Sequence, residues 1–216
     1  MSRRGRDSTT KPGERRSPPS QQEIRDTVGV RIIGGTLRGR KLAYSGDMRT
    51  RPMKDRLREA VFNLVGPEVR GTHAVDLFAG TGALGLEALS RGAARATFIE
   101  QHFPTAELIR KNASALGVGD AVDVIGANTF FWGRRGPKLS EVRWTVFCSP
   151  PYRFYVDRTA EMLELIVGLM QTAPAESAFV VEADDQFDFG QLPEPARWDV
   201  RAYAPAVVGI FRKQAQ

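Results

Sequence analysis

The residues best suited to chemistry begin with a glycine-rich turn that runs from Asp76 to Gly85. Three glycines satisfy the pattern G-x-G-x-x-G, and they let the backbone approach a ligand closely. A carboxylate ahead of them argues against a dinucleotide, because a pyrophosphate at a helix N-terminus needs positive partners. It suits a ligand with an ammonium group, such as S-adenosylmethionine (SAM). We therefore predict a SAM pocket, the alternative being a tight turn without a ligand, and expect it to be shaped by Asp76, Ala79, Gly80, Thr81 and Gly82.

Two polar residues follow the next two predicted strands and extend this prediction. Glu100 comes 20 residues after Gly80, where a carboxylate can accept hydrogen bonds from two ribose hydroxyls. Asn128 follows the third strand and offers both a donor and an acceptor to the edge of an adenine. The alternatives are an exposed strand-end charge at Glu100 and a helix N-cap at Asn128, which does not exclude a contact with adenine.

The segment Ser149-Pro150-Pro151-Tyr152 follows the apolar strand predicted at 144–148. Two prolines stiffen the turn and fix the directions of the preceding carbonyls. The Ser149 oxygen and the Pro150 carbonyl could accept the two hydrogens of an exocyclic amine, while Tyr152 stacks on the base. Two such acceptors favour a pyramidal amine and return its lone pair to nitrogen as a methyl group arrives. We predict that these three residues are catalytic, the alternative being a proline-rich turn with a core tyrosine.

Short strands and helices must position these residues. Apolar strands are expected at 74–78, 95–99, 121–125, 144–148 and 178–181, with helices between them at 82–90, 105–116 and 159–170 and a short helix or turn at 130–132. This alternation predicts an α/β fold with a mostly parallel sheet covered on both faces. Residues 198–203 and 207–212 are expected to add an antiparallel pair at one edge. Ligands of such sheets bind at the carboxyl ends of the strands.

The N-terminal end is strongly basic. Residues 1–58 carry 16 Lys and Arg against 6 Asp and Glu, whereas the rest carries 15 against 19. This asymmetry points to a polyanion, most simply a nucleic acid, although a solvated tail is the alternative for residues 1–20. Residues 1–27 are predicted to be disordered, and residues 28–66 to form a β-hairpin turning at Gly34-Gly35 and then a helix. The expected nucleic-acid contacts are Arg38, Arg40, Lys41, Arg51 and Arg56.

Composition excludes several classes of protein. The single cysteine, Cys148, rules out a disulfide framework and fits a reducing, cytoplasmic compartment. Two histidines in unrelated contexts disfavour a metal centre or a histidine-based triad. These few cysteines and histidines lead us to expect no metal. The sequence also has no apolar run of about 18 residues and no secretory signal pattern, so we expect no membrane partner.

In this order the motifs resemble those of SAM-dependent amino methyltransferases, and more closely those of the RsmD family, which methylates guanine N2 in bacterial 16S ribosomal RNA. The resemblance runs from about Val30 to Arg212, nearly residue for residue in the front half and mainly by pattern in the back half. It rests on Arg31-Ile32-Ile33-Gly34-Gly35, Arg38-Gly39-Arg40-Lys41-Leu42, Arg51-Pro52, Arg56, Arg58-Glu59, Phe62-Asn63, Asp76–Gly85, Leu86–Ala93, Phe98-Ile99-Glu100 and Ala204–Arg212.

The resemblance implies a Rossmann-like class I methyltransferase domain over 67–216, with a seven-stranded sheet. It also implies SAM as cofactor and 16S ribosomal RNA as partner, inside the small subunit or an assembly intermediate, for a protein acting as a monomer. The chain departs from the family at Ser149, where Asp or Asn is usual, and at Asn128, where Asp is usual. Three alternatives stay open: methylation of an adenine or cytosine amine in DNA or RNA, a noncatalytic RNA-binding or assembly protein, and an NAD-binding oxidoreductase. The last is disfavoured because no Tyr-Lys or His constellation could handle the substrate proton.

Overall fold

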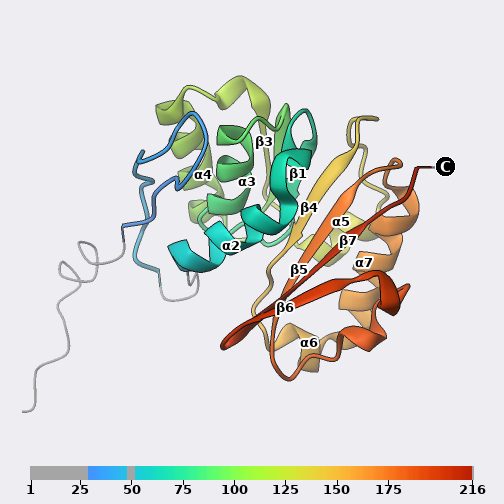
Figure 1. Cartoon of the computed structure of the whole chain (residues 1–216). Coiled ribbons are helices and arrows are strands. Elements are labelled where there is room, and N and C mark those ends of the chain that lie inside the picture. The colour runs from blue at the N-terminus through green and yellow to red at the C-terminus, as the bar shows by residue number, and fades with distance from the viewer. Residues whose placement is uncertain (1–28, 48–51, 216) are drawn as a thin grey trace, which may run out of the picture.

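The computed structural model describes residues 29–47 and 52–215 (Figure 1). The predicted disordered tail, residues 1–27, and the predicted RNA contact Arg51 lie outside these residues. Within the described part of the chain, no helix is long and apolar enough to cross a membrane.

One sheet organises the described residues. Its seven strands lie in the order β3-β2-β1-β4-β5-β7-β6. The first five run parallel, and β7 pairs antiparallel with both β5 and β6. The predicted mostly parallel sheet with an antiparallel C-terminal edge is therefore confirmed. The bounds are β1 His73–Asp76, β2 Arg95–Ile99, β3 Val122–Ile125, β4 Trp144–Cys148, β5 Ala178–Asp184, β6 Asp199–Tyr203 and β7 Ala206–Arg212.

Helices cover both faces of this sheet (Figure 1). Helices α2, α3 and α4 pack on one face, and α5, α6 and α7 pack on the other. Adjacent strand residues therefore enter opposite cores, as Ala74 and Val75 do. The helices are α2 Asp55–Val65, α3 Ala83–Ser90, α4 Phe103–Leu116, α5 Thr129–Arg134, α6 Phe154–Asp157 and α7 Thr159–Thr172.

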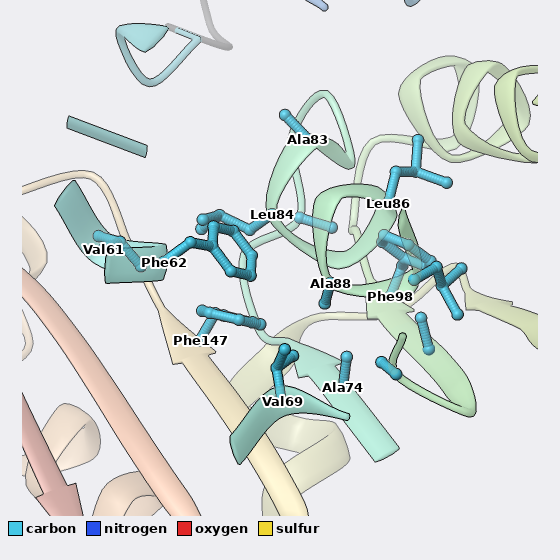
Figure 2. Packing of buried hydrophobic residues seen from close by; sticks show 14 of the residues in the cluster. Val61, Phe62, Val69, Ala74, Ala83, Leu84, Leu86, Ala88, Phe98 and Phe147 are labelled. Atoms are coloured by element: carbon cyan, nitrogen blue, oxygen red, sulfur yellow. The ribbon is translucent and has the colours of Figure 1, made fainter. Parts of the chain in front are cut away.

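The core under α2 and α3 joins the N-terminal part of the chain to the sheet. Figure 2 shows Phe62 of α2 facing Phe147 of β4, and the two ring centroids are 5.4 Å apart. Gly85 allows α3 to approach β2 closely, because a Cβ there would lie 2.3 Å from the Phe98 ring. Helix α2 therefore belongs to the same core as the sheet and α3.

The predicted two-stranded hairpin is wrong in its turn and in its strands. The segment closes antiparallel through one isolated bridge between Arg31 and Lys41, and Gly34-Gly35 is not its tight turn. Instead the Gly34 N–H donates to the Glu87 carboxylate at 2.7 Å. A Cβ on Gly35 would lie 1.9 Å from the Ser90 carbonyl oxygen. The two glycines therefore serve the close approach to α3, which overrides the local preference for a hairpin turn.

Candidate active site

The carboxyl ends of β1, β2 and β4 converge where the strand order reverses between β1 and β4. In open α/β sheets this switch point is where ligands bind. Asp76 ends β1, Glu100 follows β2, and Ser149 follows β4. Thr129 of α5 donates from its hydroxyl to the Leu77 carbonyl at 2.6 Å, which ties the segment after β3 to the end of β1.

Asp76 lies beneath the glycine-rich turn. It is buried and accepts a hydrogen bond from the Gly85 N–H at 3.1 Å, so it fixes the first turn of α3. Gly80 and Gly82 have positive φ values of 51° and 73°, which glycine adopts without strain. Burial, aided by the nearby charge of Glu100, raises the pKa of Asp76 to about 7. A cation bound beside this carboxyl would favour its ionised form.

Glu100 closes the same turn from the β2 side. Its Oε2 accepts the Gly80 N–H at 2.9 Å, and its Oε1 accepts the His102 N–H at 2.7 Å. An ionised carboxylate offers about four lone-pair sites, so these two bonds leave acceptor capacity for other donors. Glu100 is therefore held in one orientation while it remains able to accept hydrogen bonds from a ligand.

Asn128 is the N-cap of α5. Its Oδ1 accepts the N–H groups of Phe130 and Phe131 at 3.1 and 3.2 Å, and its amide donates to Gln101 at 3.3 Å. The N-cap alternative is therefore confirmed at this position. A contact between Asn128 and an adenine stays a prediction.

Ser149 and Tyr152 meet at a residue that the sequence interpretation missed. Both side-chain hydroxyls donate to the Glu182 carboxylate, Ser149 to Oε2 and Tyr152 to Oε1 at 2.6 Å. Glu182 lies on β5 and is only 6% exposed. Helix α6 begins at once after this turn, since the Phe154 N–H donates to the Pro151 carbonyl at 2.8 Å. One signal could have found Glu182: it is a carboxylate inside the apolar run Ala178–Ala183.

Four of the predicted RNA contacts lie among the described residues of the N-terminal part of the chain. All four, Arg38, Arg40, Lys41 and Arg56, are exposed, and Arg40 also donates to the Ala115 carbonyl of α4 at 2.7 Å. The segment returns to the site at its far end, because Asp47 lies 3.9 Å from His102, two residues after Glu100.

Metal ligands and thiols are further groups that could do chemistry in the part of the chain that the structure describes. Within residues 29–47 and 52–215, no cluster of three or more His, Cys, Asp or Glu side chains could hold a metal ion. Burial raises the pKa of Cys148 to about 12, so its thiol stays protonated at neutral pH and is a poor nucleophile.

Comparison with known proteins places the chain in a family. The family described as conserved hypothetical protein 95 matches residues 30–199. Ribosomal RNA small subunit methyltransferase D of Escherichia coli K12 is 33% identical over 192 residues, which are 87% of this chain and 91% of that protein. The chain belongs to the RsmD family.

Solved structures agree with the RsmD assignment. The Escherichia coli protein yhhF is 32% identical with a TM-score of 0.70, and the match covers 88% of this chain and 100% of that one. An RNA methyltransferase from Salinibacter ruber, solved with S-adenosyl-L-homocysteine, is 20% identical with a TM-score of 0.56, covering 77% and 95% of the two chains. This second likeness shows that the fold is shared.

Proposed function

We propose that this chain is a SAM-dependent methyltransferase whose target is the exocyclic N2 amine of a guanine in 16S ribosomal RNA. The observation that carries the proposal is the position of Ser149 and Pro150, which follow β4 directly beside the glycine-rich turn after β1. A methyl donor in that turn and a base amine at Ser149 would meet at the switch point of the sheet. Membership of the RsmD family supports the same reaction and substrate class.

The residues after β1 and β2 suit SAM by charge. Asp76 and Glu100 place two carboxylates at neighbouring strand ends, and SAM carries an ammonium and a sulfonium. We assign the ribose hydroxyls to Glu100, which keeps acceptor capacity beyond its two backbone bonds. Asn128 meets the adenine, and Ala79, Gly80, Thr81 and Gly82 line the turn. When bound, SAM supplies an electrophilic methyl group.

Three residues act on the target base. The Ser149 oxygen and the Pro150 carbonyl accept the amine hydrogens, and the Tyr152 ring stacks on the base. The amine lone pair is otherwise delocalised into the ring, so these acceptors return it to nitrogen before the methyl group arrives. The base must leave its stack to reach this turn, since methyl transfer requires an in-line approach to nitrogen.

The exposed basic residues of the N-terminal segment would bind RNA phosphates. Arg38, Lys41 and Arg56 carry this assignment, together with Arg40 and, outside the described residues, Arg51. The described chain has no separate RNA-binding domain, so we expect recognition to depend on the shape of a small ribosomal subunit or an assembly intermediate. We propose that the protein acts there as a monomer.

The test is mass spectrometry of 16S RNA nucleosides from cells with and without the gene. We expect one N2-methylguanosine to disappear without it and to return with the parent gene on a plasmid. The Asp76→Ala variant, expressed at the parent's level, should not restore it. Loss of a methylated adenine or cytosine instead would move the target to another amine, and an unchanged nucleoside profile would overturn the proposal.

A further inference from the structure

Glu182 reaches the predicted catalytic turn from a neighbouring strand. Strands β4 and β5 pair in parallel with Cys148 opposite Val181, so the next residues, Ser149 and Glu182, lie side by side. The Glu182 backbone is also held, because the buried Tyr155 hydroxyl donates to its carbonyl at 3.0 Å. The carboxylate therefore sits at the turn on a fixed strand.

The hydrogen bonds of Glu182 determine how two hydroxyls are oriented. An ionised carboxylate only accepts hydrogen bonds, so both Ser149 and Tyr152 must donate to it. A serine hydroxyl has one proton, and donating it leaves the oxygen lone pairs available to accept from another group. The Tyr152 ring is fixed in the same way, because its hydroxyl is anchored on the second carboxylate oxygen.

We propose that Glu182 is a positioning residue for methyl transfer, acting through Ser149 and Tyr152. This inference rests on the proposed function and deepens it. Glu182 turns the Ser149 lone pairs toward the target amine and holds the Tyr152 ring in place for stacking. Without that carboxylate the Ser149 hydroxyl could rotate and point its proton at the amine. The proton would then face the amine hydrogens and repel them, and the Ser149 oxygen would no longer accept a hydrogen bond from the amine.

The inference also gives a physical reason for serine at position 149. A hydroxyl that donates to a carboxylate becomes a stronger acceptor, because hydrogen bonds in a chain polarise one another. Ser149 and Glu182 together therefore offer the amine an oxygen closer in character to the Asp or Asn that is usual in the family. Glu182 on β5 supplies the negative charge, and Ser149, which follows β4, supplies the contact with the amine.

A double-mutant cycle tests this role. Single-turnover methyl transfer at saturating SAM and unmodified small subunits would be measured for the parent, Glu182→Gln, Ser149→Ala and the double variant. Glutamine keeps the shape but has one acceptor oxygen, so it cannot serve both hydroxyls. We expect Glu182→Gln to lower the rate about 10- to 100-fold in the parent, at or below the roughly 100- to 1000-fold seen when a preorganised group is removed outright, but only about threefold when Ser149 is already alanine.

Control measurements separate positioning from loss of structure. Affinity for SAM and the thermal midpoint of Glu182→Gln should stay close to those of the parent. Asp185→Asn removes the same charge from an exposed residue near the same strand end and should leave the rate unchanged. Equal rate losses from Glu182→Gln in both backgrounds, or no loss in the parent, would overturn the inference.

Failure of the proposed function has a different signature. It would appear as absence of methyl transfer by the parent protein itself. Glu182 would then be tested with an RNA hairpin that carries 2-aminopurine in its loop, because this base has an amine at the guanine N2 position and a fluorescence that stacking quenches. We expect quenching by the parent with S-adenosylhomocysteine present, and at least threefold weaker binding by Glu182→Gln. Equal binding by the two proteins would overturn the inference.

Discussion

Two buried carboxylates are associated with α3, Glu87 in its second half and Asp76 beneath its first turn, and their surroundings differ. Glu87 accepts the N–H groups of Ile33 and Gly34, each at 2.7 Å, and the Arg91 guanidinium at 2.8 Å. The buried Arg58 lies 3.8 Å away. Asp76, at the other end of α3, accepts one N–H from Gly85, and the charge beside it is another carboxylate. The chain's own donors surround Glu87, whereas Asp76 accepts one backbone hydrogen bond and, among the described residues, has no cation as its charged neighbour.

The difference shows how one helix serves two purposes. Around Glu87 the donors come from residues far apart in the sequence, so the contacts fasten the N-terminal segment and α2 to α3. At Asp76 the same kind of side chain is left with a raised pKa, which is a free-energy cost that a cationic ligand can remove. Functional sites are where such unbalanced groups are expected.

The largest effect should follow from removing the Glu87 carboxylate. Glu87→Ala removes the acceptor of two backbone N–H groups and of the half-buried Arg91 guanidinium, together with the carboxylate that lies 3.8 Å from the buried Arg58, so we expect a loss of about 3–5 kcal/mol in unfolding free energy. Denaturant unfolding measures it, with the exposed Glu107→Ala on α4 as the control, which should change stability by less than about 1 kcal/mol. Equal losses in the two variants would contradict the comparison.

A smaller effect is expected at the predicted catalytic turn, residues 149–152. Ser149→Ala should lower the single-turnover rate roughly 100-fold, since a neutral hydroxyl stands at the low end of the known range for one preorganised group. Ser149→Asn should retain the rate, because its amide oxygen can face the amine while its NH2 donates to Glu182. SAM affinity should change little in both variants. Parent-level activity in Ser149→Ala would leave Pro150 and Tyr152 as the groups that position the base.

The raised pKa of Asp76 should make SAM affinity depend on pH. The pKa of Asp76 lies at about 7 in the free protein, and a bound cation lowers it, so binding releases a proton below that pH. Affinity should therefore rise as pH increases from 5.5 to about 7 and level off above it. Asp76→Asn should bind SAM about tenfold more weakly at pH 8 and lose the pH dependence. Calorimetry in two buffers of different ionisation enthalpy measures the SAM affinity and the number of protons released on binding. A parent affinity that does not change with pH would contradict the prediction.

The smallest effects concern RNA binding. Neutralising Arg38 and Lys41 together should weaken binding to 16S RNA and reduce the magnitude of its salt slope by about 0.7–0.9 for each phosphate that the protein no longer neutralises. Removing residues 1–20 should weaken binding less, because charges on folded backbone are held in place. Arg40 is left intact in this comparison because it also bonds to Ala115. A larger effect from the deletion would move the RNA surface to the tail.

Sequence predicted most of the sheet because periodic apolar runs and glycine breaks are local signals. Strand β5 illustrates the limit: the apolar run predicts an end at Val181, but antiparallel pairing with β7 extends the strand to Asp184 and carries Glu182 into the site. Similarly, Gly34 and Gly35 favour a turn locally, and only contact with α3 shows their use. The end of β5 and the role of the two glycines could not be predicted from the local sequence, because each depends on contact with a segment distant in the chain.

The burial of Arg58 bears on how the chain can be dissected. A boundary at residue 66 is natural in the sequence, since helix α2 ends there and a 3₁₀ turn follows. A fragment beginning at residue 67 would lack both Arg58 and the Ile33 and Gly34 donors, and would expose the apolar face of α3 to water. We therefore expect such a fragment to aggregate when expressed alone, whereas one beginning at residue 29 keeps those partners. The sheet with α3 and the N-terminal extension share one core, so a fusion or a graft has to transfer them together.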